Sequence, residues 1–93
     1  MITSFKCKET EKIWHDIKSK KFPSDIQDRA LRKLNLLDAA LVLEDLRRLP
    51  GNYLEGLVGN RKGQMSIRVN NQRRICFVWD DGEIKDVEMI DYH

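Results

Sequence analysis

The sequence predicts an α+β fold in which two N-terminal helices pack on an antiparallel sheet of about four to five strands. Apolar residues recur at helical spacing up to about residue 48, and they alternate with polar residues after Gly51. A sheet with one face covered by two helices buries both kinds of apolar surface. The 93 residues suit a single domain that spans 1–93.

The chain begins with a predicted short strand and a first helix. Ile2 and Phe5, set among polar residues, suit a short strand. A narrow apolar stripe predicts a helix over residues 8–20, and Phe22-Pro23 then interrupts the pattern because proline lacks a backbone donor. The stripe consists of Ile13, Trp14 and Ile17.

A longer helix is predicted to follow. Ser24 and Gln27 stand three residues apart and match a capping box, so the helix is expected to begin at Ser24. Pro50-Gly51 ends the pattern, and the helix is therefore expected to run to about Arg48. Its apolar positions are Ala30, Leu34, Leu37 and Leu41, widened by Leu31, Ala40, Leu43 and Leu46.

The second half of the chain predicts an antiparallel meander of three or four strands. Residues 53–58 form a strand pattern that Gly56 and the following Gly59 weaken. Stronger alternation of apolar and polar residues marks 65–69, 75–79 and 84–90 as strands. Asn70-Asn71 and Asp80-Asp81-Gly82 are predicted turns, because Asn and Gly tolerate positive φ.

The charges are distributed unevenly, although the net charge is only +2. Residues 56–79 carry five cations and no carboxylate, whereas residues 80–93 carry six carboxylates and one lysine. Uncompensated cations attract polyanions such as nucleic acid. The alternative is that they pair with the acidic stretch that follows. The five cations are Arg61, Lys62, Arg68, Arg73 and Arg74.

The sequence disfavours several classes of protein and site. The longest apolar run is far shorter than the ~20 residues that span a bilayer, and the first residues do not resemble a signal peptide. Two cysteines, Cys7 and Cys76, suit a reducing cytoplasm and are expected to be buried, inert thiols. Two histidines cannot by themselves complete a zinc site, and nucleotide-binding glycine motifs are absent, so we expect no metal and no cofactor.

The last three residues, Asp91-Tyr92-His93, combine groups that can move protons. An ordinary histidine pKa of ~6.5 suits proton transfer at neutral pH. These residues leave a strand that is predicted to pair with the arginine-bearing strands, which would set them beside those guanidinium groups. The alternative is a mobile tail, because chain ends commonly fray.

This set of groups suits the cleavage of RNA without a metal. A base removes the proton of a ribose 2′-hydroxyl, the resulting oxygen attacks the adjacent phosphate, and an acid protonates the leaving 5′-oxygen. Arginines stabilise the extra negative charge, because their planar forks match phosphate oxygens. The product would be a 2′,3′-cyclic phosphate, and the required 2′-hydroxyl would select RNA over DNA.

Several segments resemble, in the same order, the HigB toxins of the RelE/ParE superfamily, also described as the plasmid-maintenance or proteic killer family. The resemblance rests on residues 59–69, residues 71–77 and the terminal Asp91-Tyr92-His93. Residues 1–5 and the helical segment 32–40 also resemble that family, so the likeness covers nearly the whole chain.

The resemblance implies a RelE-like, microbial-RNase-like fold and a cytoplasmic toxin that cuts mRNA in the ribosomal A site. Such a protein is a ribosome-dependent, metal-independent endoribonuclease that inhibits translation. The resemblance also implies a HigA-type antitoxin partner with a helix-turn-helix DNA-binding domain. The two proteins would form a complex, usually a heterotetramer, that binds operator DNA through the antitoxin and represses its own operon.

Carried over by position, the resemblance assigns roles to individual residues. His93 would be the acid or base, Asp91 would orient it, and Tyr92 would position the nucleotide. Arg74, the family's strand arginine, would face the scissile phosphate. RNA phosphates would be held by Arg61, the family's loop arginine, and by Lys62, Arg68 and Arg73. The chain departs from well-studied members at Glu55 and Val58, where they place a His and a Lys.

Two other functions stay open at this point. One is a binding toxin like the ParE branch, which poisons DNA gyrase and cleaves nothing, and the terminal Asp91-Tyr92-His93 argues against it. The other is a weakly active or non-catalytic module that serves mainly as the antitoxin's partner in operon repression. The absent loop lysine favours this second alternative.

Overall fold

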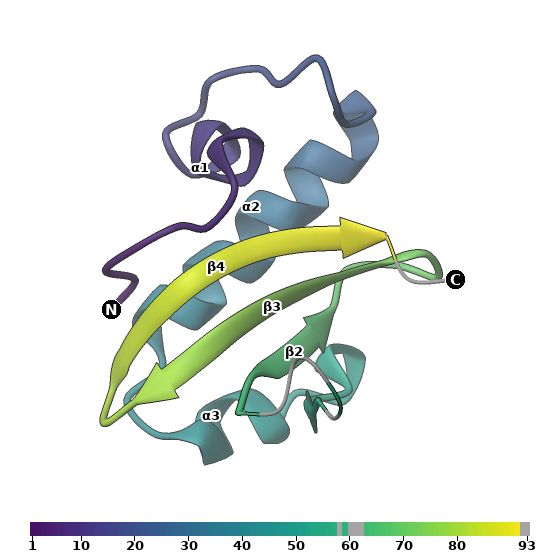
Figure 1. Ribbon diagram of the computed structural model, residues 1–93. Coiled ribbons are helices and arrows are strands. Elements are labelled where there is room, and N and C mark those ends of the chain that lie inside the picture. The colour runs from purple at the N-terminus through teal and green to yellow at the C-terminus, as the bar shows by residue number, and fades with distance from the viewer. Residues whose placement is uncertain (58, 60–62, 92–93) are drawn as a thin grey trace.

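The computed structural model describes residues 1–57, 59 and 63–91. Its helices are α1 (Lys8–Trp14), α2 (Ser24–Ala39), α3 (Leu43–Arg47) and the 3-10 helix η1 (Pro50–Asn52). Its strands are β1 (Glu55–Gly56), β2 (Met65–Arg68), β3 (Arg73–Asp80) and β4 (Glu83–Asp91). All neighbouring strands are antiparallel and follow the order β1-β2-β3-β4 (Figure 1). The predicted α+β fold class is confirmed.

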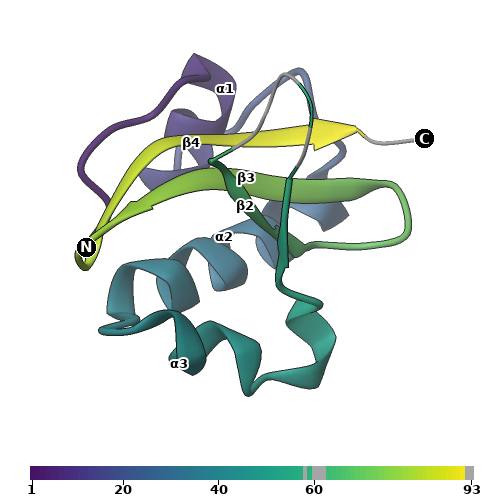
Figure 2. The same ribbon diagram turned by 60° about the horizontal axis from the view of Figure 1, so that its bottom comes forward.

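The core lies between the sheet and the helices α1 and α2, which contact each other and β4 (Figures 1 and 2). Apolar side chains from α2 meet those of the three long strands there. The buried side chains recur at helical spacing in α2 and largely at alternate positions in the strands, as the sequence pattern predicted. Within the described part of the chain, every helix is too short or too polar to span a membrane. Fully buried core residues include Leu34, Leu37, Ile67, Ile75, Phe77 and Val87.

The first residues lie along the outer edge of β4. Ile2 pairs with Ile84 and Phe5 pairs with Val87 as isolated parallel bridges. The backbone N–H of Ile2 also donates to Asp38 Oδ1 near the end of α2, at 2.9 Å. The short strand expected at the start is therefore present as two bridges rather than as a continuous strand.

The prediction of one helix from Ser24 to Arg48 was wrong, because α2 ends at Ala39. The Asp45 carboxylate accepts the backbone N–H groups of Leu41 at 2.9 Å and Val42 at 3.2 Å, and thereby starts the separate helix α3. The break leaves Leu41 81% exposed and brings Leu46, 1% exposed, into the core. The burial of Leu46 and the hydrogen bonds of the new helix cap compensate energetically for the backbone hydrogen bonds that a continuous α2 would have made.

The helix predicted over residues 8–20 was too long, since α1 ends at Trp14. Its continuation is a loop in which Ser19 is buried and donates its hydroxyl to Glu9 Oε1 at 2.6 Å. The predicted start at Ser24 is confirmed, but Gln27 does not close a capping box with Ser24. Its amide nitrogen donates instead to the carbonyls of Ser19 and Phe22, so it fastens the loop onto α2.

Both turns lie where they were predicted, but Asn70-Asn71 does not form a two-residue turn with positive φ, because residues 69–72 connect β2 to β3 and neither asparagine has positive φ. Asp81 and Gly82 have φ of 50° and 91°, as a type I′ hairpin turn requires. In the other turn, Asn70 Oδ1 accepts the backbone N–H groups of Gln72 and Arg73. These two turns set the register of β3 against both of its neighbours.

Candidate nucleic-acid interface

Two arginines lie directly opposite each other on the face of the sheet that points away from α2. Arg68 of β2 pairs in register with Arg74 of β3. Their neighbours Ile67 and Ile75 pair with each other and are buried in the core. Because successive side chains in a strand point to opposite faces, Arg68 and Arg74 share the face without helices. We call this face, with its residues Glu55, Ser66, Arg68 and Arg74, the open face.

Arg74 is held firmly although it is charged and only 6% exposed. Its Nε donates to Ser66 Oγ at 2.7 Å, and one terminal nitrogen donates to the Ser66 carbonyl at 3.2 Å. The same terminal nitrogen donates to the backbone carbonyl of Tyr53. Several acceptors thus fix the plane of the guanidinium, which limits its movement when a ligand binds.

Glu55 partly compensates the charge of Arg74. Its Oε1 lies 3.6 Å from Arg74 Nε, and its backbone pairs with Ser66 across β1 and β2. The Glu55 side chain is more than half exposed, so water screens this ion pair. The resemblance described above would place a different residue at position 55, and here Glu55 belongs to the arginine site.

Tyr53 is a site residue that the sequence analysis missed. Its ring is 59% exposed and lies 5.3 Å from Arg68 Cζ, while its carbonyl holds Arg74. Its φ of 44° is left-handed, a strained conformation for a bulky residue. An exposed aromatic ring beside two guanidiniums is the chemistry on which a nucleic-acid base stacks. The sequence around Tyr53 gave no signal of this site, because the contact between Tyr53 and the arginines joins residues far apart in the sequence.

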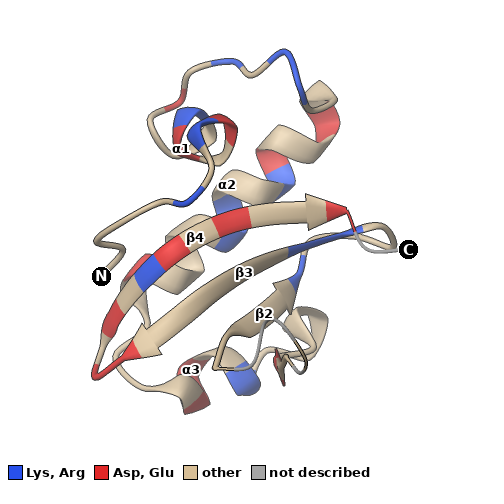
Figure 3. Cartoon of the chain, in the orientation of Figure 1, with Lys and Arg blue, Asp and Glu red and all other residues tan. Residues whose placement is uncertain are grey.

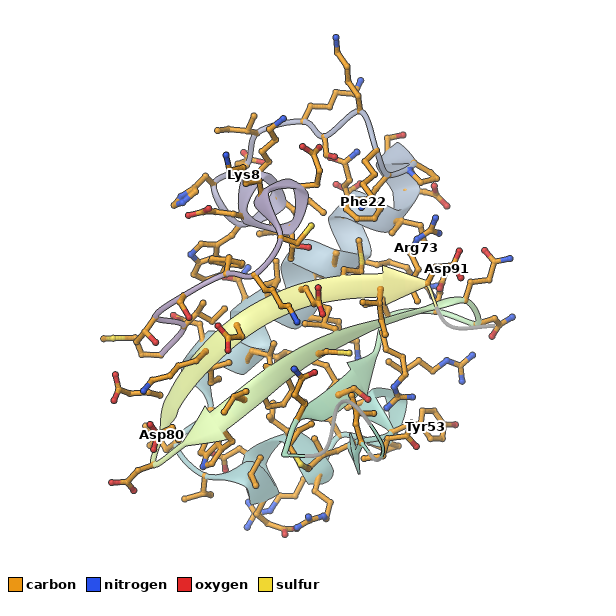
Figure 4. All side chains as sticks on the ribbon, viewed as in Figure 1. Lys8, Phe22, Tyr53, Arg73, Asp80 and Asp91 are labelled. Atoms are coloured by element: carbon orange, nitrogen blue, oxygen red, sulfur yellow. The ribbon has the colours of Figure 1, made fainter. Side chains whose placement is uncertain are left out.

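Arg73 occupies the other face of the sheet. It pairs in register with Asp91 at the end of β4, and its Cζ lies 5.8 Å from the Phe22 ring (Figure 4). Arg73 and Asp91 line a pocket of about 340 Å³ together with Phe22 and Lys21. Arg73 and Arg74 therefore lie on opposite faces of the sheet, since adjacent residues of one strand point apart. The register does bring Asp91 to the arginine end of the sheet, beside Arg73.

The remaining predicted site residues lie outside the described residues. They are Arg61, Lys62, Tyr92 and His93, and Val58 of the same loop also lies outside them. At one end of the sheet, the described structure therefore sets Arg68 opposite Arg74 on one face and Asp91 beside Arg73 on the other. The positions of the acid or base and of the loop cations stay predictions.

Acidic residues gather at the β3–β4 turn, whereas the other end of the sheet combines arginines with Asp91. Figure 3 shows basic residues where β2 ends and β3 begins, and acidic residues at the β3–β4 turn. Parts of the acidic stretch pair with lysines: Asp80 lies 2.8 Å from Lys85 Nζ, and Glu88 lies 4.0 Å from Lys6 Nζ. The hydrogen bond with Asp80 raises the pKa of Lys85. These pairs use lysines outside the five-cation stretch.

The cysteines differ in their surroundings. Cys76 is buried in β3, as expected, whereas Cys7 is only partly buried before α1. Burial raises the pKa of Cys7, but hydrogen bonds from Thr10 and the charge of Lys21 outweigh it and leave that pKa below its ordinary value. Among the described residues, no three His, Cys, Asp or Glu side chains gather closely enough to hold a metal ion.

Sequence comparison finds similar proteins along nearly the whole chain. A family model described as "RelE-like toxin of type II toxin-antitoxin system HigB" matches residues 3–93. Toxin HigB-1 of Vibrio cholerae is 48% identical over 83 residues, which is 88% of this chain and 87% of that protein.

Solved structures show the same arrangement of helices and strands. A chain of the YoeB–YefM complex from Staphylococcus aureus superposes with a TM-score of 0.62 at 22% identity, and the match covers 100% of this chain and 95% of that chain. A chain of the YoeB dimer from the same organism gives a TM-score of 0.58 at 25% identity, covering 99% and 94%.

Proposed function

Since this chain belongs to the HigB-like family of RelE-like toxins of type II toxin–antitoxin systems, we propose that it is a ribosome-dependent endoribonuclease that cuts mRNA in the A site. Toxins of the HigB and RelE-like kind are generally endoribonucleases. The observation that carries the proposal for this chain is the pair of opposed arginines on the open face, one of them fixed by several acceptors.

The fixed guanidinium of Arg74 suits the stabilisation of a phosphorane-like transition state. Its hydrogen bonds form before substrate arrives, so little reorganisation accompanies the reaction. A preorganised donor of this kind contributes roughly 10²–10³ in rate in enzymes. Arg68, which is more exposed, would hold a neighbouring phosphate, and the Tyr53 ring would stack on a base.

Proton transfer in this proposal belongs to the end of the chain. His93 takes or gives the proton of the 2′-hydroxyl or the 5′-oxygen, Asp91 orients it, and Tyr92 positions the nucleotide. The register that pairs Asp91 with Arg73 supports this, because it brings the last described residue to the arginine end. Arg61, Lys62 and Arg73 would add to the positive potential that attracts RNA. The chemistry calls for no metal ion.

The partner in this proposal is a HigA-type antitoxin with a helix-turn-helix domain. A structural relative is known in complex with YefM, and the present chain would likewise form a toxin–antitoxin heterotetramer in the cytoplasm. Operator DNA would be bound through the antitoxin, and the free toxin would act on ribosomes and mRNA.

A second function has one observation in its favour. Glu55 lies beside Arg74 and reduces the net positive charge on the open face. A carboxylate there disfavours an approaching phosphate, as expected of a weakly active toxin that serves mainly as a repressor partner.

In vitro translation followed by primer extension on the mRNA tests the proposal. Wild-type toxin is expected to produce breaks within translated codons, and His93→Gln is expected to remove them. Identical breaks with both proteins would refute the role of His93. No breaks with either would refute the nuclease, and harmless expression without antitoxin would then support the repressor-partner function.

A further inference from the structure

A polar pocket of about 520 Å³ opens where the β2–β3 turn approaches α2. Two arginines and three side-chain amides line it, and its described lining includes no carboxylate. One arginine comes from the second turn of α2 and the other from the end of β2, so both layers of the fold contribute. The lining residues are Arg29, Arg68, Asn70, Asn71 and Gln72.

Arg68 joins this pocket to the open face. Its Nε donates to the Asn70 carbonyl at 3.2 Å, and a terminal nitrogen donates to Asn71 Oδ1. The Tyr53 ring lies against the same guanidinium, 5.3 Å from Cζ. These contacts hold Arg68 at the boundary, where one guanidinium can serve two neighbouring anionic groups.

A second cation of α2 lies near Arg29, outside the lining of the pocket. Lys33, one turn further along α2, donates its Nζ to Asn52 Oδ1 at 2.6 Å. Burial lowers the pKa of Lys33, and the nearby charge of Arg29 lowers it further. Positive charge therefore continues from the open face, around the end of the sheet, to the helix layer.

We propose that this pocket binds a phosphate group of the RNA backbone other than the one that is cleaved, with Arg29 as its principal ligand. Guanidinium forks and side-chain amides are common phosphate contacts in nucleic-acid complexes. Because Arg68 borders both sites, a single RNA strand passes from the open face over the β2–β3 turn to Arg29. The inference rests on the proposed function only in taking RNA as the ligand.

The test measures binding of a 2′-O-methylated single-stranded RNA oligonucleotide, which lacks the attacking hydroxyl, by fluorescence anisotropy over a range of salt concentrations. The variants are Arg29→Gln and a matched control, Arg32→Gln, which removes the same charge from an exposed position of α2 outside the pocket. Arg29→Gln is expected to weaken binding roughly five- to tenfold at low salt. It should also lower the slope of log K against log salt by about 0.7, the value for one phosphate contact on a single strand.

Arg32→Gln is expected to change affinity less than about twofold and to leave the slope at its wild-type value, because Arg32 lies outside the pocket and would make no phosphate contact. Arg29→Lys should keep the slope and lose part of the affinity, since the charge stays and the fork is lost. Equal effects of the two Gln variants, or none from either, would overturn the proposal. Cleavage is measured separately. If the wild-type protein cleaves mRNA but Arg29→Gln binds RNA normally, only the pocket proposal is refuted. If Arg29→Gln weakens RNA binding but the wild-type protein does not cleave mRNA, only the nuclease proposal is refuted.

Discussion

The two ends of the β3–β4 hairpin are about 23 Å apart and are built in opposite ways. At the turn end, the N-terminal ammonium of Met1 donates to the Gly82 carbonyl at 3.1 Å, and Asp80 pairs with Lys85. At the arginine end, Arg68 faces Arg74 directly, and Tyr53 has a left-handed backbone. At the turn end, the acidic turn thus meets an ammonium group and a lysine. At the arginine end, two guanidiniums lie opposite each other and are only partly compensated by Glu55 and by the pairing of Arg73 with Asp91.

From this difference we predict that the turn end serves stability and the arginine end serves function. Like charges directly opposite in a sheet destabilise it, and a left-handed aromatic residue costs of order 1–3 kcal/mol. Such departures from local consistency are expected at functional sites, with compensation elsewhere in the fold. Substitutions at the arginine end should therefore change activity more than stability, and those at the turn end should do the reverse.

The largest effect is expected from Arg74→Lys, which keeps the charge and loses the planar fork. Cleavage in the translation assay should fall roughly 10²-fold, because a lysine cannot reproduce the preorganised donors. The free energy of unfolding should fall by only about 1–2 kcal/mol as acceptors lose partners. Arg73→Lys, the neighbouring control on the other face, should lose much less activity. Equal losses from the two variants would show that the faces are not distinct.

Gly82→Ala should give the largest loss of stability without loss of function. An alanine Cβ would lie 3.9 Å from the Leu41 carbonyl oxygen, which is ordinary contact, so the cost comes from the φ of 91°. Urea unfolding should show a loss of about 1–2 kcal/mol. Gly51→Ala has no positive φ and should be nearly neutral. Reduced mRNA cleavage by folded Gly82→Ala would contradict the division between the two ends.

Tyr53→Gly should separate binding from stability at the arginine end. Relief of the left-handed strain offsets the lost ring contact with Arg68, so the free energy of unfolding should change by less than about 0.5 kcal/mol. Affinity for the methylated RNA should fall roughly fivefold, the lower end expected for one lost base stack. Tyr53→Phe keeps the ring and should bind like wild type. A fall in affinity with Phe as large as with Gly would refute stacking.

The smallest effect is a pH dependence near the turn end. Hydrogen bonds from the backbone N–H groups of Leu41 and Val42 hold the pKa of Asp45 below its ordinary value. A depressed folded-state pKa stabilises the fold above the unfolded pKa of about 3.9, and this contribution is lost as pH falls through the folded-state pKa. Urea midpoints of wild type and Asp45→Asn should therefore differ most at neutral pH and converge as the pH falls through the folded-state pKa of Asp45. A constant gap would exclude titration of Asp45.

Much of the architecture could be predicted because it depends on local pattern. The alternation in residues 65–69, 75–79 and 84–90 marked the three long strands, and Ser24 marked the start of α2. The end of α2 could not be predicted, because Asp45 and Leu46 act on residues before them only once the core has formed. By helix propensity alone, the helix would continue through residues 40–42, but tertiary burial overrides this preference and ends the helix.

By itself, the sequence determined the fold class, the likeness to HigB toxins and the concentration of cations in residues 56–79, because each follows from residue type and spacing. Only the tertiary structure decided which cations lie together. Strand alternation separates Arg73 from Arg74, antiparallel register sets Arg68 opposite Arg74, and packing brings Tyr53 and Arg29 to Arg68. These contacts join distant segments, so they exist only after the sheet and helices have packed.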